Sequence, residues 1–157
     1  MFDNEMNTKD AVLAKFATIF CTIGDNRYAM AMAKDFEGKA NVSTKEVPKL
    51  GSVVTGYKAT GVKLSVKMTI YKCTEIFDNL IEEFIKTGVL PTFDIQTSNE
   101  DPSSSVGASI KIYNDVVLDG DVLLSMEKAV DDYIEQEISG YATSYGSESK
   151  FRNPEYM

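Results

Sequence analysis

The chain has 157 residues, 43% of them hydrophobic and 25% charged, which fits one folded domain and excludes a largely disordered chain. Its 16 basic and 24 acidic residues give a net charge of −8 without a basic run, which excludes tight DNA or RNA binding because such binding needs clustered Lys and Arg. Histidine is absent, so the commonest general base and metal ligand are missing.

The two cysteines, Cys21 and Cys73, are too few for a disulfide framework and form no CxxC pair. Cys21 lies in an apolar run, so we expect a buried free thiol in a protein that folds in a reducing cytosol. Residues 1–5 are acidic and polar, so we expect no secretory signal peptide. No run approaches the roughly 20 apolar residues of a membrane span, and no membrane anchor is expected.

The N-terminal third predicts an arm followed by a β-hairpin. Residues 1–13 carry no pattern and are expected to form a flexible arm. Residues 15–23 are rich in β-branched and aromatic side chains, residues 24–26 (Gly-Asp-Asn) supply turn chemistry, and residues 27–33 return to an apolar stretch. Residues 35–46 have a weaker pattern that allows a further strand.

A long loop is predicted over residues 45–61. Its sequence from residue 48 onward, PKLGSVVTGYKATG, contains three glycines and a proline, which is typical of irregular structure. Loops of this length in a compact domain usually have a function.

Residues 63–71 give the clearest strand pattern. Apolar and polar side chains alternate strictly, which predicts one buried and one solvated face. Lys63 and Lys67 lie on the solvated face with Ser65 and Thr69.

One amphipathic helix is predicted over residues 74–86. Thr74 is placed to cap its N-terminus and Gly88 to end it. Its apolar side chains recur at helical spacing and are expected to form a single core face: Ile76, Phe77, Leu80, Ile81, Phe84 and Ile85.

The second half of the chain predicts more strands and an exposed tail. The expected strands are residues 91–97, 108–118, 122–126 and 131–143, with a tight hairpin turn at 119–121 and an exposed tail at 144–157. With strands before and after the only helix, the fold class is mainly β: an antiparallel β-sandwich or barrel with one packed α-helix.

No catalytic or metal constellation emerges. Asp119-Gly120-Asp121 lacks the spacing and flanking helices of an EF-hand and is typical of a hairpin turn. The acidic residues between 131 and 137 alternate along one strand face, which is typical of a solvated surface. Ser103–Ser105 have no histidine partner for a catalytic triad. The pattern therefore predicts no enzyme and no cofactor.

Three stretches carry a resemblance to a known family. Residues 54–61 (VTGYKATG), the following strand that ends in Thr-Ile-Tyr-Lys, and the helix up to Gly88 resemble the tail tube protein of PBSX-type prophages and R-type bacteriocins. Residues 118–127 (LDGDVLLSME) and the acidic strand around residue 136 are similar to the family's C-terminal half. The resemblance spans roughly residues 15–143.

The resemblance implies a subunit that forms hexameric rings, stacked as the inner tube of a contractile tail. The implied partners are other copies of the chain, a contractile sheath protein, a baseplate or tube initiator and a tape measure protein. The implied location is a virion tail or bacteriocin particle, made in the bacterial cytoplasm and released by lysis. No specific nucleic-acid binding is implied.

Two sets of residues become candidate sites on this interpretation. The loop at residues 45–61 would contact the next ring through Lys45, Lys49, Val53, Val54, Tyr57 and Lys58. Charges on the lumen or outer surface would come from Lys63, Lys67, Glu135 and Glu137. The alternative is a monomeric β-barrel that binds a small ligand, which would require an enclosed apolar pocket.

Overall fold

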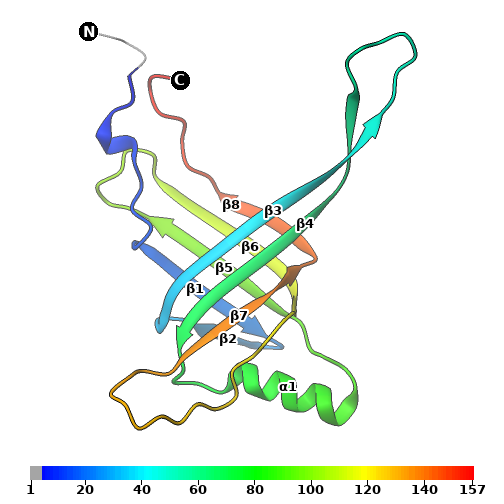
Figure 1. Cartoon of the computed structure of the whole chain (residues 1–157). Helices are drawn as coiled ribbons and strands as arrows, with labels where there is room; N and C mark the ends of the chain where they lie inside the picture. Colours follow the sequence, from blue (N-terminus) through cyan, green and yellow to red (C-terminus); the bar gives the residue numbers. More distant parts are fainter. Residues whose placement is uncertain (1–4) are drawn as a thin grey trace.

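The computed structural model describes residues 5–157, so residues 1–4 of the expected arm lie outside the described residues. Within this range the chain is mostly β-structure with one α-helix (Figure 1). In chain order the elements are a 3-10 helix Thr8–Asp10, β1 Ala17–Ile23, β2 Asn26–Ala29, β3 Ala33–Val47, β4 Gly56–Tyr71, α1 Ile76–Thr87, β5 Phe93–Glu100, β6 Ala108–Leu118, β7 Glu135–Ala142 and β8 Ser144–Ser149. The predicted antiparallel β fold with one helix is confirmed.

The strands form one curled antiparallel sheet in the order β2-β1-β5-β6-β7-β4-β3, and β8 pairs with β6. The outermost strands of this order, β2 and β3, are consecutive in the chain, so their short connection brings the two ends of the sheet together. There the N–H of Met30 donates to the carbonyl of Ile19 (2.8 Å) and that of Tyr71 to the carbonyl of Met32 (3.1 Å). Figure 1 shows β3, β4 and β7 crossing β1, β5 and β6, which makes two layers of an open sheet.

A bend between β7 and β8 lets one stretch of chain serve both layers. β7 pairs with β4 along its length, whereas β8 pairs with β6. At the bend, Thr143 donates from its N–H to the carbonyl of Asn114 and from Oγ1 to that of Asp115, each at 3.0 Å. Asp115 has a φ of 50°, and its own N–H donates to Asp94 Oδ1 at 2.8 Å, which stabilises this left-handed conformation.

The core lies between the two layers, and the alternation predicted for residues 63–71 is confirmed because the apolar side chains of this strand face it. Cys21 is fully buried, as expected. The core cluster of buried apolar residues consists of Ile19, Cys21, Met30, Val66, Met68, Ile70, Phe77, Leu80, Phe93, Ile95, Tyr113, Val116, Leu118 and Ile138.

Helix α1 begins and ends close to the predicted bounds, but only part of its stripe is buried. Gly88 has a φ of 77°, and its N–H donates to the carbonyl of Phe84 (2.8 Å), so the predicted C-terminal cap is confirmed. The predicted cap at Thr74 is wrong, since Glu75 occupies the N-cap without a side-chain hydrogen bond.

Two residues of the predicted core face of α1 are solvent-exposed. Phe77 and Leu80 are buried, and Ile76 and Ile81 are half-buried against the core. In contrast, Phe84 is 46% and Ile85 76% exposed, so their placement in the core was wrong. The reason is geometric: the C-terminal half of the helix extends past the end of the sheet, where no core remains to cover it (Figure 1).

The loop predicted over residues 45–61 is much shorter in the structure. β3 runs to Val47 and β4 starts at Gly56, so residues 48–55 alone are irregular. The Val47–Gly56 pair continues the β3–β4 ladder, and these backbone hydrogen bonds satisfy polar groups that a loop would leave to water. Two of the three glycines that suggested a loop, Gly56 and Gly61, are accommodated in β4, whereas Gly51 lies in the remaining loop with a φ of 75°.

Two further predictions need correction in the C-terminal half. Residues 122–126 form no strand, because the Leu123 carbonyl accepts hydrogen bonds from the side chains of Lys72 and Gln136 instead of a neighbouring strand. The tail from residue 144 starts with β8, which pairs with β6, and is irregular from residue 150 onward.

Candidate assembly surfaces

The distal part of the β3–β4 hairpin, residues 41–62, extends away from the rest of the molecule (Figure 1). We call it the hairpin arm. Every residue in it except Gly56 is exposed. All the residues predicted to contact a next ring lie here: Lys45, Lys49, Val53, Val54, Tyr57 and Lys58. The structure therefore brings this set together on one projecting element.

The face of the hairpin arm that continues the core-facing side of the sheet is largely apolar. Directly opposite residues of two paired strands share a face, and the pairs on this face are Val42–Val62, Thr44–Ala59 and Glu46–Tyr57. Val42, Val62 and Tyr57 are 56%, 59% and 67% exposed. Nothing in the described chain covers these side chains, although they continue the line of the core.

The opposite face carries lysines. In β3 this face holds Lys39 and Lys45, and in β4 it holds Lys58, Lys63 and Lys67. Lys45 lies directly opposite Lys58, and like charges in this position destabilise a strand pair. An acidic surface placed against this face would remove the repulsion.

The lysines give the chain a marked separation of charge. Residues 38–74 hold seven of the 16 basic residues and one of the 24 acidic ones, so this stretch carries +6 and the remainder −14. The absence of a basic run in the sequence concealed this separation, because the lysines alternate with other residues and meet only when the two strands pair.

The four residues predicted as lumen or surface charges lie on the outer side of β4 and β7. Lys67 Nζ lies 3.6 Å from Glu137 Oε1, whereas Glu135 Oε1 lies 3.0 Å from Lys34 Nζ. Three of the four are therefore paired with opposite charges. Lys63 lies further along β4, opposite Asn41 of β3.

Open strand edges flank the sheet. Within residues 5–157, β3 pairs with β4 alone, β2 with β1 alone and β8 with β6 alone. Each outer edge presents unpaired N–H and C=O groups, which can accept a strand from another chain. The β3 edge runs over 15 residues, so it offers the longest ladder.

A buried polar cluster links α1 to the segment between β6 and β7. Asp78 accepts hydrogen bonds from Lys72 Nζ (2.6 Å) and Gln136 Nε2 (2.8 Å), and both donors also reach the Leu123 carbonyl (2.8 Å each). Sequence reasoning missed this cluster. The sequence feature that could have indicated it is Gln136, a polar residue next to Ile138 on the otherwise apolar face of β7.

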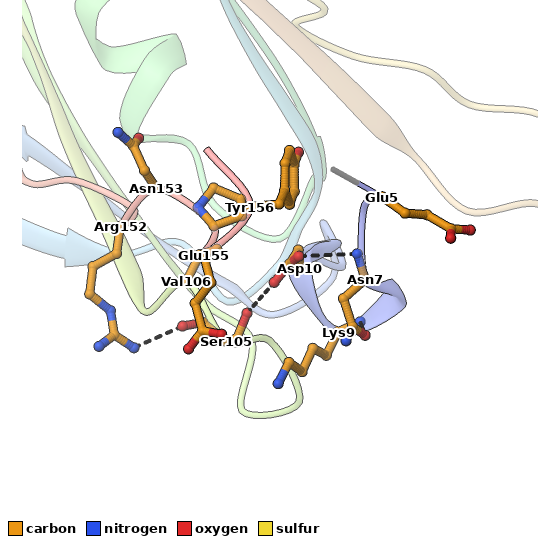
Figure 2. A pocket seen from close by; sticks show the side chains of 11 residues that line it. Glu5, Asn7, Lys9, Asp10, Ser105, Val106, Arg152, Asn153, Glu155 and Tyr156 are labelled. Carbon is orange, nitrogen blue, oxygen red and sulfur yellow. Dashed lines mark hydrogen bonds between the residues drawn. The ribbon is translucent and has the colours of Figure 1, made fainter. Parts of the chain in front are cut away.

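A cleft of about 610 Å³ lies between the two chain ends and the β5–β6 loop (Figure 2). Arg152 donates from its side chain to the Ser105 carbonyl (2.8 Å), and Ser105 donates from its hydroxyl to Asp10. The lining is mostly polar and charged, and includes Lys9 and Glu155. It therefore does not provide the enclosed apolar pocket that a small-ligand-binding barrel requires.

Asp101, in the β5–β6 loop, fastens the N-terminal segment. Its Oδ2 accepts from the N–H of Leu13 (2.9 Å), and its Oδ1 accepts from the N–H and hydroxyl of Ser103 (2.9 and 2.7 Å). These hydrogen bonds favour the ionised carboxylate and hold the pKa of Asp101 below its usual value. The hydrogen bond from the Ser103 hydroxyl makes the largest contribution.

None of the helices in the described part of the chain has the length and apolar character to cross a membrane.

Comparison with known proteins assigns the chain to a family. The model of a family described as "Phage tail tube protein" matches residues 4–146. The phage-like element PBSX protein XkdM of Bacillus subtilis (strain 168) is 33% identical over 98 residues, which cover 62% of this chain and 67% of XkdM.

Solved structures share the fold at low sequence identity. A chain of the tube-terminating cap of the anti-feeding prophage superposes with a TM-score of 0.66 at 11% identity, over 93% of this chain and 96% of that one. A chain of the sheath–tube complex of the extracellular contractile injection system PVC gives a TM-score of 0.60 at 12% identity, over 84% and 88%.

Proposed function

We propose, starting from the premise that this chain belongs to the phage tail tube protein family, that its copies join into hexameric rings which stack as the inner tube of a contractile tail or R-type bacteriocin. The protein is structural and non-enzymatic. Its action would be to form a rigid hollow rod when joined to other copies.

The observation that supports this proposal is the hairpin arm. It is a 22-residue extension whose apolar and basic faces are exposed in a single copy, and a neighbouring copy could cover both faces. The residues proposed for the contact between rings are the six that sequence analysis selected on the arm. Many such contacts, each weak, would hold a polymer by multivalency.

The open strand edges support lateral joining within a ring. A contact between two different edges can repeat from copy to copy around an axis. The copies form a closed ring when the rotation between neighbours divides a full turn evenly. Closure would satisfy the backbone groups that the β3 edge leaves unpaired in one copy.

The remaining partners follow from the role in a contractile tail. We propose a surrounding sheath protein, a baseplate or tube initiator, and a tape measure protein inside the tube. Lys63, Lys67, Glu135 and Glu137 stay candidate lumen or surface charges. The particle would be made in the bacterial cytoplasm and released by lysis.

The test is to shorten the hairpin arm without disturbing the body. Ser43 pairs with Gly61, so residues 44–60 can be replaced by Asn-Gly, which closes a two-residue turn at this register. The shortened chain should fold with unchanged thermal stability, because the removed residues contact no core. It should form no tubes in negative-stain micrographs under conditions in which the full chain does.

A full-length chain that stays monomeric when the tail's initiator and sheath proteins are supplied would refute the function. Normal tubes from the shortened chain would instead refute the role of the arm.

A further inference from the structure

We propose that the hairpin arm of one copy docks onto the end of a second copy that is formed by α1 and residues 119–134, which we call the acidic end. This inference rests on the proposed function and adds to it the surface that receives the arm. The contact would be head to tail and would combine charge attraction with burial of apolar side chains.

The acidic end presents an apolar stripe that the chain itself leaves open. Phe84 and Ile85 continue the buried line of Phe77 and Leu80 along α1 but are 46% and 76% exposed, and Val89 beyond the helix is 66% exposed. A helix whose apolar stripe is longer than the core beneath it marks a docking surface.

The neighbouring segment, residues 119–134, adds negative charge. It contains five acidic residues and one lysine. Among its apolar side chains, Val130 is 62% and Tyr133 80% exposed. Its Leu123 carbonyl is hydrogen-bonded to Lys72 and Gln136, which also hold Asp78 of α1, so the helix and the segment form one surface.

The hairpin arm has the complementary chemistry. Leu50 and Val53 at its tip are fully exposed, and Val54 is 72% exposed. Lys45, Lys49 and Lys58 surround them on the arm, with Glu46 as the one acidic residue. Arm against arm and acidic end against acidic end would both place like charges together, so complementarity favours the contact between the two different surfaces.

The placement of the two surfaces suits a repeating contact. The hairpin arm projects at one end of the molecule, whereas α1 and residues 119–134 lie at the other (Figure 1). A contact between two different surfaces at opposite ends leaves each new copy with a free arm or a free acidic end. Such a heterologous contact extends a stack without closing it.

Charge reversal on each surface tests the pairing. One full-length variant carries Lys49→Glu and Lys58→Glu, and a second carries Glu83→Lys and Asp131→Lys. Each reversal places like charges in the proposed contact, so the yield of sedimented tubes should fall about tenfold or more for either variant alone. A control with Lys15→Glu and Lys150→Glu, which are also exposed but belong to neither surface, should assemble as the wild type does.

Mixing the two reversed variants is the decisive step. The reversed arm of the first fits the reversed end of the second, and their unchanged surfaces also fit each other. An equimolar mixture should therefore recover the tube yield, and one chain with all four substitutions should assemble alone. Circular dichroism verifies that each variant is folded.

A second measurement does not depend on charge. In this measurement Cys73→Ser removes the exposed native thiol, and Leu50→Cys and Ile85→Cys are introduced together in one chain. Tubes assembled from this variant should give disulfide-linked ladders. Variants with just one of the two new cysteines should give none. This pairing would be overturned if the charge-reversed variants assembled normally, if mixing them did not recover the tube yield, or if intact tubes gave no disulfide cross-link. Each of these outcomes would leave the tube function standing. A wild type that forms no tubes when the tail's initiator and sheath proteins are supplied would overturn both.

Discussion

Lys72 Nζ lies 2.6 Å from Asp78 Oδ2, and the two side chains are only 9% and 13% exposed. This ion pair joins the end of β4 to α1 and, through the Leu123 carbonyl, to the segment that forms part of the acidic end. Breaking one side of a buried pair leaves an uncompensated charge in a weakly solvating environment.

The substitution Asp78→Ala should therefore lower the free energy of unfolding by about 3 kcal/mol or more. The matched control is Glu37→Ala, which breaks an ion pair to Lys39 whose side chains are 61% and 71% exposed. That change should cost less than about 1 kcal/mol, because exposed pairs contribute little. Urea unfolding measures both, and equal costs would show that the Lys72–Asp78 pair is not buried in solution.

Gly38 lies against the ring of Tyr113, so that a β-carbon at position 38 would overlap the phenol oxygen. Gly38→Ala should destabilise the protein by about 1–3 kcal/mol through this overlap. Gly61 is the control, since a β-carbon there meets nothing within 4 Å, and Gly61→Ala should change the free energy of unfolding by less than about 1 kcal/mol. Thermal melts of the two variants compare the sites directly; similar melting temperatures would argue against this packing.

Leu80 and Phe84 belong to the same apolar stripe, but replacement by aspartate should destabilise the protein much more at Leu80 than at Phe84. Leu80 is 3% exposed, and Leu80→Asp should cost on the order of 4 kcal/mol, because the carboxylate would lose its hydration. Phe84 is 46% exposed, so Phe84→Asp should cost about 1 kcal/mol or less in the monomer. Chemical denaturation separates the two; an equally large loss at Phe84 would mean that the helix is covered within one copy.

The two thiols should differ in reactivity. Burial, with a smaller contribution from the negative charge of Asp94, raises the pKa of Cys21 to about 12, whereas Cys73 is exposed. Because the thiolate is the nucleophile, iodoacetamide at about pH 8 should alkylate Cys73 alone in the folded protein and both thiols in denaturant. Intact-protein and peptide mass spectrometry identify the sites, and rapid native labelling of Cys21 would contradict its burial.

Stability should depend on pH through Asp101. Its pKa is lowered in the folded state, so the unfolded chain takes up the proton first as the pH falls. The stabilisation is therefore present above the ordinary carboxyl pKa and is lost as the pH falls through the lower, folded-state value.

The difference in unfolding free energy between wild type and an Asp101→Asn variant should accordingly stay constant above about pH 5 and shrink as the pH falls below about 4. Urea unfolding at a series of pH values measures this difference. A constant difference would mean that Leu13 and Ser103 do not bind the ionised carboxylate preferentially.

Local pattern was enough to predict the antiparallel β fold, the β1–β2 hairpin, the strand ending at Tyr71 and a helix closed by Gly88. These features depend on the spacing of side chains two to four positions apart in the chain, and this spacing can be read directly from the amino-acid sequence. The resemblance to tail tube proteins likewise depends on local motifs, and it is confirmed by the family match.

Sequence patterns did not predict features that depend on contacts between distant segments of the chain. Helical periodicity placed Phe84 and Phe77 on one face, but the length of the sheet beneath the helix decides that just one of them is buried. Glycine content suggested a loop at residues 45–61, yet cross-strand hydrogen bonds extend the hairpin through most of it. The lysine face, the partners of Asp78 and the two ends of opposite charge arise from strand register and chain packing, which bring together residues that lie far apart in the sequence.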